Sequence, residues 1–270
     1  MNQGGQPQAE PIIRVEDFHA AYRGRTVLEN VSFDVYPGEV FVIAGGSGCG
    51  KSTVLKHMIG LYRPVGGRVV IDGVDIHAVH GAELVALRRR FGVAFQGGAL
   101  FGSLTVLENV RLPLEEFTSL NRSQMDMIAL AKLALVGLDS SAQKLPSELS
   151  GGMQKRAALA RAIALDPKIV FLDEPSAGLD PITSAELDQI ILSLSGLLRM
   201  TFVVVTHELP SIFTIADRVV VLDAAVKTMV AVDKPASLRD HSPNRWVRAF
   251  FNRQAGGGAG NGAEEKGSQI

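Results

Sequence analysis

Cysteine is almost missing from this chain of 270 residues, in which Cys49 is the only one. A single thiol excludes an intrachain disulfide and suits a reducing compartment such as the cytosol. No run reaches the roughly 18 consecutive apolar residues that a membrane-spanning helix requires. Residues 1–11 are polar and rich in Gly and Gln, unlike a signal peptide. The 27 basic and 28 acidic side chains balance, so no net positive field favours nucleic acid.

Hydrophobic residues make up 46% of the chain, which is ample for a large core. The sequence predicts an antiparallel β portion over residues 11–37 and 66–77. Parallel strands are expected near Val40, Phe91, Ile169, Thr201 and Arg218, with helices between them. A helical insert spans about 97–150, with helices over 105–117 and 123–136. We expect a flexible N-terminus (1–10), one large domain (11–240), a C-terminal amphipathic helix (241–254) and a disordered Gly-rich tail (255–270).

A glycine-rich phosphate loop lies between an apolar strand (40–44) and a helix (52–59). The pattern G-x-x-x-x-G-K-[ST] is filled by Gly45, Gly50, Lys51 and Ser52. Backbone N–H groups of such a loop surround phosphates, and the helix dipole favours the same anion. Lys51 is suited to reach the β- and γ-phosphates, and the Ser52 hydroxyl to bind Mg²⁺. The predicted nucleotide-binding residues here are Gly45, Gly46, Ser47, Gly48, Cys49, Gly50, Lys51, Ser52 and Thr53.

Two carboxylates end a second apolar run, Ile169-Val170-Phe171-Leu172-Asp173-Glu174. Ligands bind at the carboxyl ends of strands in open parallel sheets. We therefore expect Asp173 to hold Mg²⁺ and Glu174 to orient and deprotonate the attacking water. A strand that ends in Asp-Glu is common by itself, and the upstream phosphate loop is what makes this pattern specific.

Three single residues complete the predicted site. Gln96 ends an expected strand over 91–95 and is placed to reach Mg²⁺ or the attacking water. His207 ends an expected strand over 201–206 and is placed to bond the γ-phosphate. Tyr22, expected between two strands (12–18 and 26–35), is suited to stack on adenine. Alone, each residue is typical of a surface, capping or packing position, and their order around the two motifs favours the functional interpretation.

A second glycine motif, LSGGMQ at residues 149–154, opens a strongly helical run over 153–164. With this motif the chain resembles the nucleotide-binding subunit of an ABC transporter, from about residue 12 to 231. The resemblance implies an α/β P-loop NTPase with a RecA-like, mainly parallel sheet, an antiparallel β subdomain and an ABC-type helical subdomain. It also implies ATP hydrolysis with Mg²⁺ as cofactor. The bound nucleotide is then expected between two copies of the chain.

In that family the glycine motif of one subunit acts on the nucleotide of the other. The resemblance assigns γ-phosphate contacts to Ser150 and Gly152, counts Gly151 among the nucleotide-binding residues, and places Asp180 where the chain crosses between the two sites. Because the sequence has no membrane span of its own, a separate integral permease is implied. The expected location is the cytoplasmic face of a bacterial inner membrane, with attachment through the permease and no nucleic-acid partner.

The segment Phe95-Gln96-Gly97-Gly98-Ala99-Leu100-Phe101 resembles that of ATPases serving Mla/Mce-type lipid transporters. Residues 149–167 and 178–183 are similar to the same group. This resemblance implies phospholipid movement across the cell envelope, with Mce-domain and STAS-domain proteins as further partners. Gly97 replaces the usual Ser of this group, and Ser176-Ala177 replaces bulkier residues in some members.

Two alternatives stay open. An ATPase of an amino-acid or other small-solute importer shares LSGGMQ, although the methionine type carries an extra C-terminal domain for which this tail is too short. ABC ATPases of DNA repair or translation typically show long insertions or two nucleotide domains. This chain has one phosphate loop and an insert of about fifty residues.

The segment 243–253, PNRWVRAFFNR, predicts a short helix with one aromatic, apolar face. Trp246 pairs with Phe250 and Val247 with Phe251 at i,i+4 spacing. This face either packs on its own domain or docks on protein, and we expect the second ATPase subunit or a small regulatory subunit. Cys49, inside the phosphate loop at a helix N-terminus, is expected to be a reactive thiol that bound ATP protects.

Overall fold

The computed structural model describes residues 10–22 and 24–254. The expected flexible N-terminus lies almost wholly, and the expected disordered tail wholly, outside the described residues. The strands are β1 (Ile13–Tyr22), β2 (Arg25–Val35), β3 (Val40–Gly45), β4 (Gly66–Ile71), β5 (Val74–Asp75), β6 (Phe91–Ala94), β7 (Ile169–Asp173), β8 (Thr201–Val205), β9 (Arg218–Asp223) and β10 (Thr228–Asp233). The helices are α1 (Lys51–Met58), α2 (Gly81–Arg88), α3 (Val106–Phe117), α4 (Arg122–Leu135), α5 (Gly151–Ala162), α6 (Pro181–Leu198), α7 (Leu209–Ile215), α8 (Pro235–His241) and α9 (Arg245–Phe251). Two 3-10 helices cover Asp139–Ser141 and Pro146–Glu148.

These strands form two sheets. The larger sheet has the order β10-β9-β3-β8-β7-β6, and all of its neighbours are parallel except β10 with β9. The smaller sheet is antiparallel, in the order β2-β1-β4-β5. The predicted mixture of a parallel core and an antiparallel portion is confirmed. The antiparallel edge strand β10 was not predicted.

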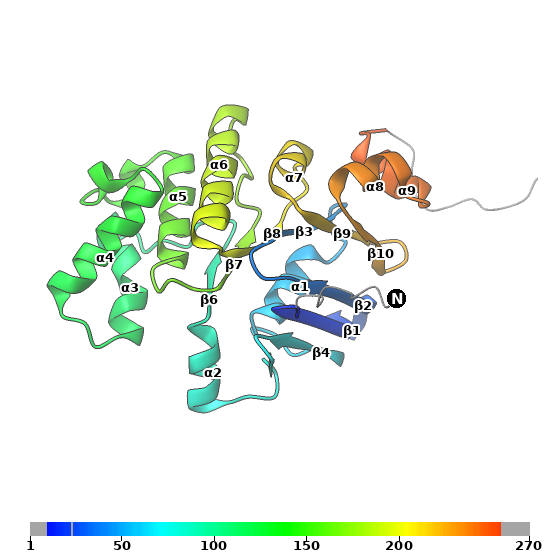
Figure 1. Ribbon diagram of the computed structural model, residues 1–270, viewed down its shortest axis with the longest axis horizontal. Helices are drawn as coiled ribbons and strands as arrows, with labels where there is room; N and C mark the ends of the chain where they lie inside the picture. Colours follow the sequence, from blue (N-terminus) through cyan, green and yellow to red (C-terminus); the bar gives the residue numbers. More distant parts are fainter. Residues whose placement is uncertain (1–9, 23, 255–270) are drawn as a thin grey trace, which may run out of the picture.

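Each face of the larger sheet supports its own core. Alternate residues of a strand point to opposite faces, so Val40 and Val42 join one core while Phe41 and Ile43 join the other. The second core also contains α1 and the inner face of β1, β2 and β4, so α1 lies between the two sheets (Figure 1). The phosphate-binding turn before α1 therefore rests on a fully packed helix.

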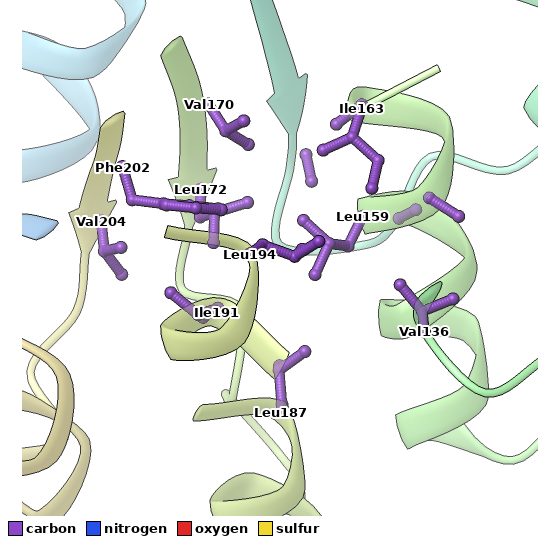
Figure 2. Packing of buried hydrophobic residues seen from close by; sticks show 14 of the residues in the cluster. Val136, Leu159, Ile163, Val170, Leu172, Leu187, Ile191, Leu194, Phe202 and Val204 are labelled. Atoms are coloured by element: carbon purple, nitrogen blue, oxygen red, sulfur yellow. The ribbon is translucent and has the colours of Figure 1, made fainter. Parts of the chain in front are cut away.

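The other face of the larger sheet is covered by helices. Figure 2 shows Ile191 and Leu194 of α6 on the side of that helix that faces β7 and β8. Helices α3, α4 and α5 form a separate group at one end of the sheet, while α7, α8 and α9 lie at the other end (Figure 1). The predicted helical insert is present as α3 and α4.

The helices of the insert, α3 and α4, have strong start signals at their N-termini. Thr105 accepts a hydrogen bond from the Glu108 N–H, and the Glu108 carboxylate accepts one from the Thr105 N–H. Asn121 and Gln124 form the same reciprocal pair before α4. Capping boxes of this kind satisfy backbone donors that a helix leaves unpaired.

Helix α9 packs on its own chain. Val247 and Phe251 are fully or almost fully buried in the core that also contains α6 and α7, and Trp246 and Phe250 pack partly against it. The Asn244 side chain caps the helix by accepting from the N–H groups of Trp246 and Val247. The expectation that the aromatic face docks on another protein is therefore wrong for Val247 and Phe251. The spacing of the apolar residues predicted the apolar face of α9. It did not predict the surface on which this face packs, because that surface is formed by distant elements such as α7.

Candidate functional site

The phosphate loop follows β3, the central strand of the larger sheet. Gly45 has φ 144°, and a Cβ there would lie 2.3 Å from the Leu222 carbonyl oxygen of β9. Gly50 has φ 100°, and a Cβ would lie 2.8 Å from the Leu28 side chain. Only glycine accepts both the left-handed backbone and the close approach. The two glycines thus allow the chain to turn sharply from β3 into α1.

Lys51 is almost fully buried at the first residue of α1. Its ammonium donates hydrogen bonds to the carbonyl oxygens of Gly45, at 3.0 Å, and Gly46, at 3.1 Å. The lysine therefore spans the loop from inside and places its ammonium beside the helix N-terminus. A buried cation combined with a helix dipole favours an anion at this position.

The carboxyl end of β7 lies beside this loop. The Ser52 hydroxyl donates to Asp173 Oδ1 at 3.0 Å. Burial raises the pKa of Asp173, and the nearby Glu174 raises it further, while the Ser52 hydrogen bond opposes both. Hard cations prefer oxygen ligands such as this carboxylate and hydroxyl. The pair is thus a suitable anchor for a divalent cation, which would offset the cost of the buried charge.

Glu174 has an unusual backbone for a glutamate. Its φ is 47°, in the left-handed region, and its N–H donates to the Val205 carbonyl oxygen at 2.8 Å. Such a conformation costs on the order of 1–3 kcal/mol in a non-glycine residue and recurs at functional sites. It turns the side chain of Glu174 out of the strand direction. Oε1 contacts His207 Nδ1 at 2.8 Å, whereas Oε2 is buried without a hydrogen-bond partner.

One cavity of about 520 Å³ brings most of the predicted residues together. It is lined by Val27, Gly45, Gly46, Ser47, Gly48, Gly50, Lys51, Ser52, Thr53, Gln96, Glu174, His207 and Phe250. Gln96 lies two residues beyond β6 and His207 two residues beyond β8, each slightly after the end of its strand. The lining contains a cation, a carboxylate and backbone donors, which is a set suited to a polyphosphate.

Helix α5 holds the segment that contains Gln96. The Lys155 ammonium donates to the Gln96 carbonyl, and the Arg161 guanidinium donates to the carbonyls of Gly98 and Ala99, both at 2.8 Å. Burial lowers the pKa of Lys155, and the nearby Asp173 and Glu174 oppose that change. Sequence reasoning missed Lys155 and Arg161, although both belong to the helix that the LSGGMQ motif opens.

Seven predicted residues do not line this cavity, namely Tyr22, Cys49, Asp173, Ser150, Gly151, Gly152 and Asp180. Ser150 is exposed as the N-cap of α5, where its hydroxyl accepts from the Met153 N–H at 3.3 Å. Gly151 is also exposed, and a Cβ on Gly152 would lie 2.2 Å from Thr183 Cγ2 of α6. Asp180 caps α6 by accepting from the N–H groups of Ile182 and Thr183, both at 3.0 Å. The glycine motif thus presents a helix N-terminus on a surface separate from the phosphate loop.

Tyr22 also lies outside the lining. It is the last residue of β1 and pairs with Arg25, so it belongs to a strand rather than to the connection that the sequence suggested. The β1–β2 hairpin is longer than expected because the pairing continues past Phe18 through bulges. Tyr22 is 63% exposed.

Cys49 does not face the cavity. Its thiol is 1% exposed and belongs to the core beneath the loop, and burial raises its pKa. The prediction that Cys49 is a reactive thiol is therefore wrong. The helix N-terminus and Lys51 do favour a thiolate, but desolvation outweighs them.

We expect Cys49 in the native protein to react with a thiol reagent at least about tenfold more slowly than the same thiol in guanidinium chloride, because burial removes both access and thiolate. The measurement is the labelling rate with Ellman's reagent in the two conditions. Rapid labelling of the native protein that ATP prevents would contradict this placement.

The fold and the cavity define a class of protein. A parallel sheet whose central strand leads through a glycine-rich loop into a helix, beside a strand that ends in Asp-Glu, is the arrangement of a phosphate-loop nucleoside triphosphatase. The chain belongs to the ABC transporter family, whose sequence profile matches residues 28–177. It is an ATP-binding ATPase subunit of that family.

Two relatives are similar over most of the chain. The probable ribonucleotide transport ATP-binding protein mkl of Mycobacterium leprae is 40% identical over 258 residues, which cover 96% of this chain and 74% of the relative. The intermembrane phospholipid transport system ATP-binding protein MlaF of Escherichia coli is 39% identical over 246 residues, which cover 91% of this chain and 90% of MlaF. The chain spans 66% of the length of the mkl protein of Mycobacterium tuberculosis.

Solved structures agree. The ATP-binding cassette MJ0796, solved as a dimer in a post-hydrolysis state bound to ADP and Pi, has a TM-score of 0.75 and 32% identity, covering 82% of this chain and 98% of the other. The protein cbiO1 of Clostridium perfringens, part of the ABC transporter complex cbiONQ, has a TM-score of 0.77 and 27% identity, covering 90% of this chain and 96% of the other.

Proposed function

We propose that this chain powers a lipid transporter by binding and hydrolysing ATP at a site shared with a second copy. The observation that carries the proposal is the single cavity in which Lys51, Gln96, Glu174 and His207 meet around the phosphate loop. These side chains come from positions 51 to 207 of the sequence, and the parallel sheet brings the ends of their strands to one edge.

Phosphate binding falls to the loop and to Lys51. Backbone N–H groups at the N-terminus of α1 are donors for phosphate oxygens, and the Lys51 ammonium adds a full charge beside them. We assign the sugar and base to the side of the cavity near Val27, with Tyr22 beyond it as the stacking residue. Cys49 belongs to the loop by its sequence position, whereas its side chain lies in the core.

Water activation falls to Glu174. His207 holds Oε1 at 2.8 Å, which leaves Oε2 as the acceptor for the proton of an attacking water. Gln96 is exposed at the cavity wall, and its amide is suited to orient that water. The bond that forms joins the water oxygen to the γ-phosphorus, and the bond that breaks releases ADP.

The residues present fit Mg²⁺. Among residues 10–22 and 24–254, no group of three His, Cys, Asp or Glu side chains is placed to hold a metal ion. Magnesium does not need one, because it is usually bound through one or two carboxylates, substrate phosphates and water. We assign it to the Ser52 hydroxyl and Asp173, with Gln96 as a further ligand. When bound, it would neutralise charge that develops on the phosphates.

A second copy completes the site. Ser150, Gly151, Gly152 and Asp180 are predicted nucleotide residues, yet they lie outside this chain's own cavity. Ser150 is exposed at the N-terminus of a 12-residue helix, where the dipole favours an anion. We propose that it faces the γ-phosphate held by the partner. The dimeric cassette MJ0796 supports this arrangement.

The transported molecule is proposed from the relatives. MlaF is matched over 90% of its length and is described as part of an intermembrane phospholipid transport system. None of the helices within 10–22 and 24–254 is long and apolar enough to cross a membrane. We propose an integral permease as partner, with Mce-domain and STAS-domain proteins as accessory subunits. We place the complex at the cytoplasmic face of the inner membrane.

The test is a purified complex of this chain with the permease encoded beside it, in phospholipid nanodiscs. We expect ATP turnover that fluorescent phospholipid stimulates and ribonucleotides do not. Lys51→Ala should reduce turnover at least about a hundredfold, because it removes the buried cation that contacts the phosphates. Lys144→Ala changes an exposed lysine outside the cavity and should behave like wild type. Stimulation by ribonucleotides alone would favour the activity named for mkl, and failure to co-purify with a permease would contradict a transport role.

A further inference from the structure

One side chain in the wall of the nucleotide cavity belongs to none of the predicted motifs and comes from the end of the chain. Phe250 of α9 lines the same cavity as the phosphate loop, Glu174 and His207. Apart from Val27, every other residue in the lining belongs to a segment that the sequence assigns to the nucleotide. Helix α9 therefore contributes to a site that its sequence position does not suggest.

The position of Phe250 is set within its own chain. The next residue, Phe251, is 3% exposed and meets Phe213 of α7 edge to face, with ring centroids 5.9 Å apart. Phe250 and Phe251 are themselves 5.3 Å apart at 83°. Because α7 begins two residues after His207, this cluster connects α9 to the segment that positions the histidine. The ring of Phe250 is thus anchored from behind.

Trp246 packs against the ring of Phe250. Their rings are stacked, with centroids 5.7 Å apart and planes inclined by 28°. Aromatic rings in this arrangement attract each other beyond simple burial. Trp246 is also the only tryptophan of the chain. Its fluorescence therefore reports the surroundings of one side chain, and that side chain touches a wall of the nucleotide cavity.

A half-buried aromatic ring in a polar cavity has a specific physical effect. Water beside an apolar surface is unfavourable, so a ligand that displaces it gains free energy. Removal of water also strengthens the interaction of phosphates with Lys51 and the loop. The loop and the strand-end side chains are polar, and Phe250 supplies an apolar contact that they lack. A nucleotide offers both a polyphosphate and apolar ring surface.

We propose that Phe250 contacts the bound nucleotide and that α9 is consequently part of the nucleotide site, an inference that rests on the proposed ATP binding. Nucleotide binding then changes the environment of the Trp246–Phe250 stack in a single chain. It does not require a second copy, because every residue of the anchoring cluster belongs to the same chain.

The test is a titration of the full-length chain with ADP and with ATP at protein concentrations that differ tenfold. We expect a saturable change in Trp246 emission whose midpoint equals the calorimetric Kd and does not shift with protein concentration. Phe250→Leu should raise the Kd for both nucleotides about fivefold, because an aromatic contact is lost, and should at least halve the emission change.

The matched control is Phe251→Leu, the same change one residue further along the helix. It should lower the Tm, because Phe251 is a core residue, and should leave the Kd and the emission change as in wild type. Phe250→Tyr, which keeps the ring, should retain the wild-type Kd within about twofold.

Three outcomes separate the possibilities. A wild-type chain that binds neither nucleotide would contradict the proposed function itself. Nucleotide binding with silent Trp246 emission and an unchanged Kd in Phe250→Leu would overturn this inference alone. An emission change seen only with ATP and only at high protein concentration would also overturn it, since Phe250 would then meet a second copy rather than the nucleotide.

Discussion

Replacement of Glu174 by glutamine is expected to reduce ATP turnover at least about a hundredfold while the Kd for ATP stays within about threefold, because a general base contributes roughly 10²–10⁴ to a rate. Glutamine keeps the size of the side chain and the contact with His207. It lacks a basic oxygen, so the attacking water has no proton acceptor.

The geometry makes this change selective. Glu174 Oε1 is already engaged with His207 Nδ1 at 2.8 Å, and Oε2 is buried without a partner. The phosphate contacts proposed above come from the loop and Lys51, which the substitution leaves intact. Binding should therefore persist without hydrolysis, and a dimer closed around ATP should accumulate.

The measurement is steady-state phosphate release together with ATP binding by calorimetry, and size-exclusion chromatography detects the trapped dimer. Glu208→Gln is the matched control, because Glu208 is a neighbouring carboxylate outside the cavity lining, with Oε1 3.8 Å from His207 Nε2. It should hydrolyse ATP like wild type. Turnover of Glu174→Gln within a few-fold of wild type would contradict the role given to this residue.

The sequence was most informative where chemistry requires fixed residue types. A backbone that turns sharply around an anion requires glycines and a cation at fixed positions. This requirement predicted Gly45, Gly50 and Lys51, and the structure places them at such a turn. Asp173 and Glu174 stand at the end of an apolar run, and this run forms the fully buried strand β7 between β8 and β6. Because parallel strands end at one edge, the order of these motifs was enough to predict a common cavity.

The same reasoning failed where the role of a residue depends on the direction of its side chain. Cys49 lies inside the phosphate-loop pattern, but the turn directs its thiol into the core, where Gly45 leaves room for it. The periodicity of apolar residues predicted the apolar face of α9, but it does not predict which surface packs against that face. Phe250 could be placed in the cavity wall only after α7, α8 and α9 were packed together. These features depend on contacts distant in sequence.

Ser150→Arg is expected to abolish hydrolysis in the dimer without weakening ATP binding to the single chain. Ser150 is exposed and lies outside its own chain's cavity, so a bulky cation there cannot touch the nucleotide bound to the same chain. It would instead occupy the space that the partner's γ-phosphate needs at the N-terminus of α5. Turnover should fall at least about a hundredfold, as when a group that stabilises the transition state is lost.

The substitution also removes the N-cap of α5, which costs about 1 kcal/mol of stability, so the Tm must be measured alongside. Ser150→Ala loses the same cap without adding bulk and should retain far more activity than the arginine variant. Ser140→Arg, at an exposed position of the 3-10 helix Asp139–Ser141, is the control for added charge and should hydrolyse ATP normally.

Mixing variants tests whether the site is shared. In a dimer of one Ser150→Arg chain and one Lys51→Ala chain, the intact Lys51 of the first faces the intact Ser150 of the second, and the other site carries both defects. Each variant alone should be inactive, while an equal mixture should recover about a quarter of the wild-type sites, as expected for random two-fold pairing. A mixture as inactive as its components would mean that one intact site cannot turn over alone. Full-rate hydrolysis by isolated Ser150→Arg monomers would show that the second motif does not act across the dimer.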